Sequence, residues 1–129
     1  MLVAVADRST MFDRVGGEDF FERLTTRFYQ AVAEDPVLRP LYPDDLEPPR
    51  VHLKLFLMQY WGGPARYREE RGDPRLRMRH APFRIGPAER DAWVMHMSEA
   101  VRSLGLRPLD ESQMLGYLTN AATHLINVD

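Results

Sequence analysis

Apolar residues recur along this chain at steps of three and four, the spacing that gathers side chains on one face of an α-helix. The clearest example runs from about Glu18 to Ala33 and predicts a long helix. Its apolar stripe consists of Phe21, Leu24, Phe28 and Val32. Pro36 ends this segment, because proline removes a backbone donor and clashes with the preceding turn.

The same pattern predicts three more long helices. The first begins at Glu47-Pro48-Pro49, since proline is tolerated in a first turn, and it ends at Gly62-Gly63-Pro64. The other two span residues 87–104, after Gly86, and roughly 109–127. Four substantial helices are therefore expected.

Shorter segments connect these helices. Residues 12–15 can form one helical turn that Gly16-Gly17 stops, and residues 37–43 form a turn that places Tyr42 at a corner before Pro43. Residues 66–79 are polar and irregular, which predicts a loop with a short helix leading to His80. No pattern predicts strand pairing or an internal repeat. The expected fold class is all-α.

Length and charge narrow the class of protein. At 129 residues the chain can bury one real core, and we expect a domain over residues 11–129 after an N-terminal extension over 1–10. Met11 could also serve as the start. The net charge of −2 lacks the basic surplus typical of nucleic-acid binding. With no cysteine, disulfides and thiolate metal sites are excluded.

The N-terminus does not have the form of a signal peptide. Only its first six residues are apolar, and no basic region precedes them. No stretch of the sequence approaches the length of a transmembrane span. The expected location is the cytoplasm.

One histidine stands within an arginine-rich segment, residues 75–85. His80 is followed directly by Ala81-Pro82, so its segment must end there and the imidazole lies at a helix terminus. A neutral imidazole is a good iron ligand, and guanidinium groups pair with carboxylates. Haem offers both targets, an iron and two propionates. The alternative is a solvated histidine in a basic loop.

Eight arginines lie between positions 66 and 90, against four acidic residues. Most of them are expected to form a solvated basic face. Arg79 adjoins His80 and is the candidate to pair with a propionate. A nucleic-acid patch is a third reading, but the segment lacks interleaved exposed aromatics.

Three aromatic side chains could supply hydrogen bonds to a ligand. The phenols of Tyr29 and Tyr42 and the indole N–H of Trp93 can each donate, and bound dioxygen with partial negative charge is a suitable acceptor. Taken singly, each could equally be a core residue. Histidines 52, 96 and 124 lack H-x-x-x-H spacing, so no zinc site is expected.

Together these segments resemble a truncated haemoglobin, most closely the second group, of the actinobacterial O type. The resemblance covers Met11 to Val128, nearly the whole chain. The matching segments are Gly16-Gly17, Arg27-Phe28-Tyr29, Tyr42-Pro43, Tyr60-Trp61-Gly62-Gly63-Pro64, Arg75 to Ile85 and Arg90-Asp91-Ala92-Trp93.

The resemblance implies a two-over-two helical sandwich, a shortened globin fold, around a b-type haem. His80 matches the proximal iron ligand, and Tyr29, Tyr42 and Trp93 match the distal cluster that binds the ligand. The other residues expected at the haem are Arg79, Leu53, Phe56, Tyr67, Phe83 and Met97. Because the chain has no cysteine, the haem would be held non-covalently. Pro49 departs from the small gating residue usual at its position.

The expected function is binding of oxygen and other diatomic ligands, such as nitric oxide or carbon monoxide. Each good hydrogen bond to a polarised ligand is worth about 1.5–3 kcal/mol, so three donors would make oxygen release slow. The alternative is a haem oxidoreductase, a nitric oxide dioxygenase or a peroxidase-like enzyme acting on peroxide. It would need a partner reductase, because the chain has no flavin or nicotinamide domain. A haem-free helical interaction module is the third reading, and homo-oligomer formation is left open.

Overall fold

The computed structural model describes residues 10–129, and all regular secondary structure in this part of the chain is helical. Its elements are α2 (Met11–Val15), α3 (Glu18–Glu34), η1 (Arg39–Leu41), α4 (Glu47–Tyr60), α5 (Arg66–Arg71), α6 (Leu76–His80), α7 (Pro87–Arg102) and α8 (Pro108–His124). The all-α prediction is confirmed, and the four long helices lie within three residues of their expected bounds. The predicted extension falls outside the described residues except for Thr10, which caps α2.

One segment differs from the prediction. Residues 66–79 were expected to form a loop with one short helix, but they contribute to two helices, α5 and α6. Gly72 separates the two with a φ of 77°, a conformation that glycine adopts without strain. Arg75 then adopts a φ of 41° directly before α6, so the chain turns sharply before it reaches His80.

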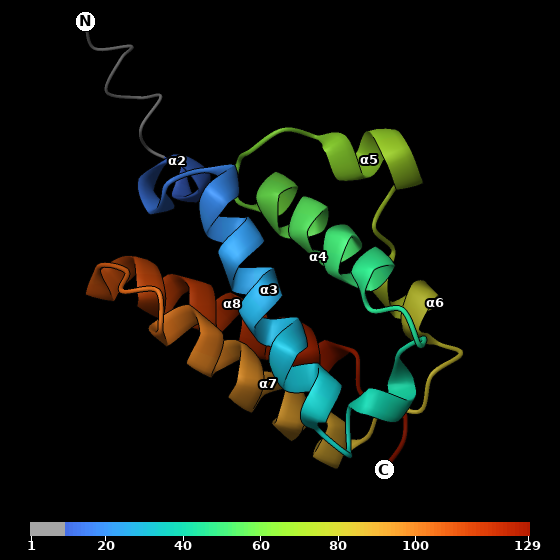
Figure 1. Ribbon diagram of the computed structural model, residues 1–129. Coiled ribbons are helices and arrows are strands. Elements are labelled where there is room, and N and C mark those ends of the chain that lie inside the picture. The colour runs from blue at the N-terminus through green and yellow to red at the C-terminus, as the bar shows by residue number, and fades with distance from the viewer. Residues whose placement is uncertain (1–9) are drawn as a thin grey trace, which may run out of the picture.

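The long helices pack as two pairs (Figure 1). Helix α3 packs on α4 and helix α7 packs on α8, while α3 also contacts α7 and so joins the two pairs. This is the two-over-two sandwich that the sequence resemblance implied. No helix within the described residues is long and apolar enough to cross a bilayer.

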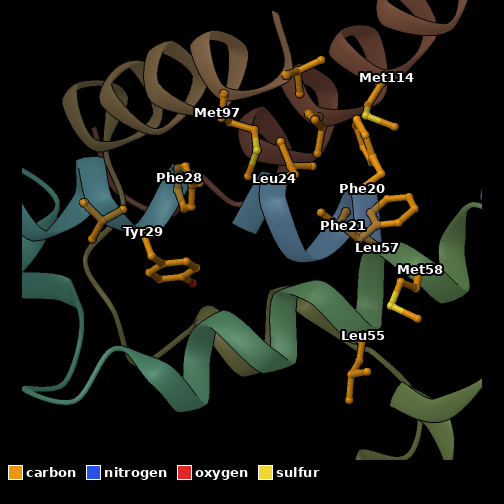
Figure 2. Packing of buried hydrophobic residues seen from close by; sticks show 14 of the residues in the cluster. Phe20, Phe21, Leu24, Phe28, Tyr29, Leu55, Leu57, Met58, Met97 and Met114 are labelled. Carbon is orange, nitrogen blue, oxygen red and sulfur yellow. The ribbon is translucent and has the colours of Figure 1, made fainter. Parts of the chain in front are cut away.

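The core is built around α3. Its predicted stripe of Phe21, Leu24, Phe28 and Val32 is confirmed, because each of these side chains is fully buried. The same buried cluster, part of which Figure 2 shows, includes residues of the other long helices: Leu55, Leu57, Met58, Met97, Val101, Met114 and Leu118. Burial of each large apolar side chain is worth about 1.5–3 kcal/mol, which explains why α3 holds a central position.

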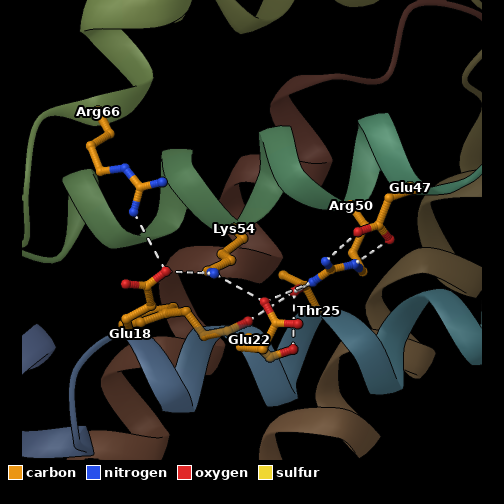
Figure 3. Close-up of polar contacts among 8 residues, drawn as sticks. Glu18, Glu22, Thr25, Glu47, Arg50, Lys54 and Arg66 are labelled. Carbon is orange, nitrogen blue, oxygen red and sulfur yellow. Dashed lines mark hydrogen bonds and ion pairs between the residues drawn. The ribbon is translucent and has the colours of Figure 1, made fainter.

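An ion-pair network fixes α4 against α3 (Figure 3). Lys54 Nζ lies 2.7 Å from Glu18 Oε2 and 3.0 Å from Glu22 Oε1, while Arg50 reaches Glu22 at 3.1 Å and Glu47 at 2.7 Å. These cations hold the pKa of Glu18, Glu22 and Glu47 below the ordinary value, mainly through side-chain hydrogen bonds. The network thereby sets the position of α4, whose other side chains border the functional site.

Candidate functional site

The helices surround a cavity of about 330 Å³. This is within the range of about 300–1,000 Å³ that is common for small-molecule sites. Its walls are mostly apolar and include Leu38, Leu41, Leu53, Phe56, Leu57, Phe83, Ile85, Leu118, Ala121, Ala122 and Leu125. Polar side chains from α3, α4, α6 and α7 border the same space, so the cavity combines an apolar interior with a small set of donors.

His80 borders the cavity from the last position of α6. Its Nδ1 lies 2.6 Å from the carbonyl oxygen of Leu76, four residues earlier. A carbonyl can only accept, so Nδ1 carries the proton and Nε2 keeps its lone pair. Within residues 10–129, Nε2 has no hydrogen-bond partner. This is the tautomer that an imidazole needs in order to bind a metal through Nε2.

The segment after His80 is held by the end of the chain. Asn127 donates through Nδ2 to the carbonyl oxygen of Phe83 at 2.8 Å and of His80 at 3.4 Å. Its Oδ1 accepts from the backbone N–H of Ile85 at 2.9 Å. No local sequence pattern marks Asn127, because it lies more than 40 residues from the segment that it holds.

Tyr29, Tyr42 and Trp93, the side chains expected to hold a ligand, all line the cavity. The rings of Tyr29 and Tyr42 are edge-to-face with centroids 5.5 Å apart, and Phe28 packs on Trp93 at 5.3 Å. Burial raises the pKa of Tyr42 to about 12, while hydrogen bonds from Tyr29 and Trp93 oppose this rise. Burial also raises the pKa of Tyr29, and Tyr42 adds to this effect. Both phenols are therefore protonated at neutral pH.

The direction of these hydrogen bonds matters for function. The influence of Tyr29 and Trp93 on the pKa of Tyr42 is that of donors to its oxygen, and Tyr42 in turn raises the pKa of Tyr29. The Tyr42 hydroxyl lines the cavity and stays protonated at neutral pH. The cluster can present this proton to a ligand in the cavity.

The polar edge of the cavity contains Arg71, Arg79 and His52. Arg79 donates to the backbone carbonyl oxygens of Pro74 at 2.7 Å and Arg71 at 2.6 Å, and Arg71 Nη1 lies 3.0 Å from His52 Nε2. Both guanidinium groups lie over the Tyr67 ring, at 6.0 Å for Arg71 and 5.8 Å for Arg79. Arg79 is expected at the site because it adjoins His80 in the sequence, whereas no sequence pattern places Arg71 or His52 there. The contact between Arg71 and His52 joins two separate helices.

Most of the other predicted site residues also line the cavity. Leu53, Phe56, Tyr67 and Phe83 are among the lining residues. Met97 is not: it is almost fully buried in the core cluster. It lies one turn after Trp93 on α7, and helical periodicity alone does not separate a position that faces the core from one that faces a cavity.

Pro49 also lines the cavity, and it belongs to the first turn of α4, which begins at Glu47. His96 and His124 lie outside the cavity lining. Across residues 10–129, no group of three or more His, Asp or Glu side chains could hold a metal ion. A larger and more open groove of about 550 Å³ lies between α3 and α7 and includes Asp35 and His96.

The cavity fits a haem in the chemistry of its donors. Its apolar walls suit a porphyrin, and His80 Nε2 is a free imidazole ligand. The arginines at its edge suit propionate carboxylates. A two-over-two helical sandwich with these features defines a haem-binding globin.

Comparison with known proteins agrees with this class. The family model for bacterial-like globins matches residues 10–127, and the chain belongs to this family, whose members bind haem b and diatomic gases. The group 2 truncated haemoglobin YjbI of Bacillus subtilis is 40% identical over 111 residues, which cover 86% of this chain and 84% of that protein.

Solved structures give the same result. A thermostable haemoglobin from the actinobacterium Thermobifida fusca is 56% identical with a TM-score of 0.90, covering 92% of this chain and 98% of that one. A truncated oxygen-avid haemoglobin from Bacillus subtilis is 38% identical with a TM-score of 0.88, covering 92% of this chain and all (100%) of that one. These similarities confirm the truncated haemoglobin resemblance and its second group.

Proposed function

We propose that His80 binds the iron of a b-type haem through Nε2, and that Tyr29, Tyr42 and Trp93 hold a diatomic ligand in the cavity. The observation that supports this most directly is the 2.6 Å contact between His80 Nδ1 and the Leu76 carbonyl oxygen. It fixes the ring orientation and the tautomer, so Nε2 is the nitrogen available as a ligand. Haem supplies the iron at which oxygen and other diatomic gases bind.

Tyr42 is the central donor of the distal cluster in this proposal. In this proposal its oxygen accepts from Tyr29 and Trp93, whose effect on its pKa is that of donors, and these donors polarise its own O–H group and strengthen it as a donor. A hydrogen bond to a charged or polarised acceptor is worth about 1.5–3 kcal/mol, so its loss would change ligand dissociation about 10- to 100-fold. We therefore propose slow release of oxygen. The oxygen-avid relative from Bacillus subtilis is consistent with this proposal.

Arg71 and Arg79 are proposed to face the propionates. Backbone carbonyl oxygens hold Arg79 through Nε and Nη2, which orients its guanidinium group at the edge of the cavity. Arg71 is exposed and reaches the same edge from α5. Two cations at one rim suit a cofactor that carries two carboxylates.

No specific observation favours the enzymatic alternative. Peroxidase chemistry needs a base that takes a proton from peroxide within the distal site. His52 is the histidine on α4 that borders the cavity, but its Nε2 accepts from the Arg71 guanidinium, so this lone pair is occupied. Burial and the Arg71 charge lower the pKa of His52. Nitric oxide dioxygenation would still require a partner reductase.

Haem reconstitution of His80→Ala tests the proposal. We expect the wild-type protein to develop a Soret band with haem, and the variant to show a lost or shifted band that added imidazole restores. His124→Ala is the matched control, because His124 makes the same Nδ1 contact to a carbonyl oxygen four residues earlier, at 2.8 Å, but lies outside the cavity. An unchanged spectrum in His80→Ala would overturn the assignment.

A further inference from the structure

Four of the five tyrosines line the cavity, and the fifth stacks on one of them. The lining residues are Tyr29, Tyr42, Tyr67 and Tyr117. Tyr60 lies at the end of α4, and its ring is stacked on Tyr117 with centroids 3.8 Å apart and planes 20° apart. Tyr60 is also 49% exposed. The stacked pair therefore connects the cavity wall with solvent.

We propose that Tyr117 and Tyr60 carry electrons from the surface to the cavity when hydrogen peroxide reacts there, and that Tyr60 is the side chain left oxidised. The inference rests on the proposed function, since the cavity must hold haem. Tyrosine is an oxidisable side chain, and contact between two such rings gives the short step that electron transfer needs. The reaction need not be a fast catalytic cycle, because a single exposure to peroxide is enough to oxidise the protein.

The other cavity tyrosines do not offer such a path. Tyr29 and Tyr42 contact each other, and Tyr29 also packs on Phe28 in the core. Tyr67 is 4% exposed and packs on Phe56, whose ring has no hydroxyl group and is hard to oxidise. Of the five tyrosines, Tyr60 alone is exposed.

Proton release favours Tyr60 as the end point. A phenol that loses an electron becomes a strong acid and must give up its proton. Burial raises the pKa of Tyr117 to about 12, and the nearby Tyr60 adds to this effect. A charged phenolate is therefore unfavourable at this position. Tyr60 can pass its proton to water. Trp61 touches both rings edge-on, but its buried indole N–H has no hydrogen-bond acceptor among the described residues, so it cannot release a proton.

The electrons and atoms balance for two copies of the chain. One hydrogen peroxide takes up two electrons and two protons and becomes two molecules of water. Each of two Tyr60 phenols supplies one electron and one proton. When the two rings then join through a carbon–carbon bond, each has lost one hydrogen in total and the product is dityrosine.

The test is to treat haem-loaded protein with hydrogen peroxide and map the products by peptide mass spectrometry and dityrosine fluorescence. A parallel sample contains a nitroso spin trap, which labels an oxidised tyrosine even where two copies do not couple. We expect the product at Tyr60, and no such product in haem-free protein given the same peroxide. Tyr117→Phe keeps the ring and its stacking but removes the oxidisable phenol, so it should lose most of the Tyr60 product.

The Soret band of every sample separates the two proposals. Without the band in the wild-type protein, the proposed function fails. With the band present, an unmodified Tyr60 or an equal yield in Tyr117→Phe overturns the electron route. Trp61→Phe should keep the Tyr60 product, and a loss as large as that in Tyr117→Phe would place the route through Trp61 and also overturn the proposal.

Discussion

Asp35 Oδ2 lies 2.6 Å from His96 Nε2, and this contact ties the segment that carries Tyr42 to the helix that carries Trp93. Asp35 Oδ1 also accepts from the backbone N–H of Val37 at 2.7 Å, so the carboxylate organises the turn that follows α3. Trp93 lies one turn before His96 on α7. The distal donors therefore meet partly because a pair outside the cavity holds their two elements together.

This arrangement predicts a specific pH dependence of stability. The hydrogen bond from His96, followed by those from the backbone, lowers the pKa of Asp35. A carboxylate with a folded-state pKa below its unfolded value of about 3.9 contributes stability above that pH and loses it as the pH falls through the folded value. We expect Asp35→Asn to lower the melting temperature at neutral pH, and the difference from wild type to shrink below about pH 4.

Thermal melts between neutral and acid pH provide the measurement. Asp44→Asn is the control on the same connecting segment, because the Asp44 carboxylate is exposed and makes no hydrogen bond within the described residues. A melting difference for Asp35→Asn that stays constant down to acid pH would contradict the assignment of this carboxylate.

Tyr42→Phe should release oxygen faster than any other single change in the distal cluster. It removes the hydroxyl proposed to donate to the ligand, together with the oxygen that Tyr29 and Trp93 are proposed to donate to. From a hydrogen bond of about 1.5–3 kcal/mol, we expect a dissociation rate about 10- to 100-fold higher. Stopped-flow mixing of the oxygenated protein with a competing ligand measures it, and an unchanged rate would remove Tyr42 from the proposed cluster.

Trp93→Phe tests the supporting donor. Phenylalanine keeps an aromatic ring against Phe28 but loses the indole N–H that is proposed to polarise Tyr42. We expect faster oxygen release, by less than in Tyr42→Phe, because Tyr42 itself remains. The other tryptophan supplies the matched control: Trp61 is not among the cavity-lining residues, so Trp61→Phe should leave the rate unchanged. Equal rates in Trp93→Phe and wild type would make Trp93 a packing residue only.

Much of the fold is predictable from the sequence because local rules decide it. The spacing of Phe21, Leu24 and Phe28 predicts both the long α3 helix and its buried face, and Pro36 predicts its end. Proline and glycine likewise mark the two ends of α4. These signals act over three or four residues, so tertiary packing is not needed to read them.

The site is less predictable because much of it depends on contacts between distant residues. The pair Asp35–His96 spans 61 residues, and Asn127 holds a segment more than 40 residues away. No local pattern marks either contact. Met97 shows a limit of local patterns. Its spacing on α7 identifies the side chain as buried, but it does not tell whether the side chain faces the core or the cavity. Side-chain chemistry and a family resemblance point to the remaining candidates: His80, Tyr29, Tyr42 and Trp93.

Lys54→Met should weaken the connection between α3 and α4. The Lys54 side chain is only 13% exposed and lies within 3.0 Å of both Glu18 and Glu22. We expect the free energy of unfolding to fall by about 1 kcal/mol, and the loss to be smaller at high salt, because both glutamates are partly exposed. Urea denaturation measures this change. Arg23→Met is the control, since Arg23 and Asp19 are exposed and 3.9 Å apart, and it should change stability by less than about 0.5 kcal/mol.

Two glycine substitutions should change stability in opposite directions. A Cβ at Gly63 would lie 2.6 Å from Phe12 Cδ1 and 2.9 Å from the Met58 carbonyl oxygen, and that backbone atom cannot move aside cheaply. We expect Gly63→Ala to cost about 1–3 kcal/mol, in the range of overpacked sites. It should also disturb the contact in which the Phe12 N–H donates to the Trp61 carbonyl oxygen at 2.9 Å, which holds α2 to the end of α4.

Gly116 is the matched site, because a Cβ there meets nothing within 4 Å and the residue lies inside α8. Alanine is favoured over glycine within a helix by about 0.5–1 kcal/mol, so Gly116→Ala should stabilise the protein by that amount. Chemical denaturation of both variants beside wild type measures the two effects. If Gly63→Ala is as stable as wild type, the close approach of α2 to the end of α4 can relax. If Gly116→Ala is less stable than wild type, α8 is more crowded at this position than its open face indicates.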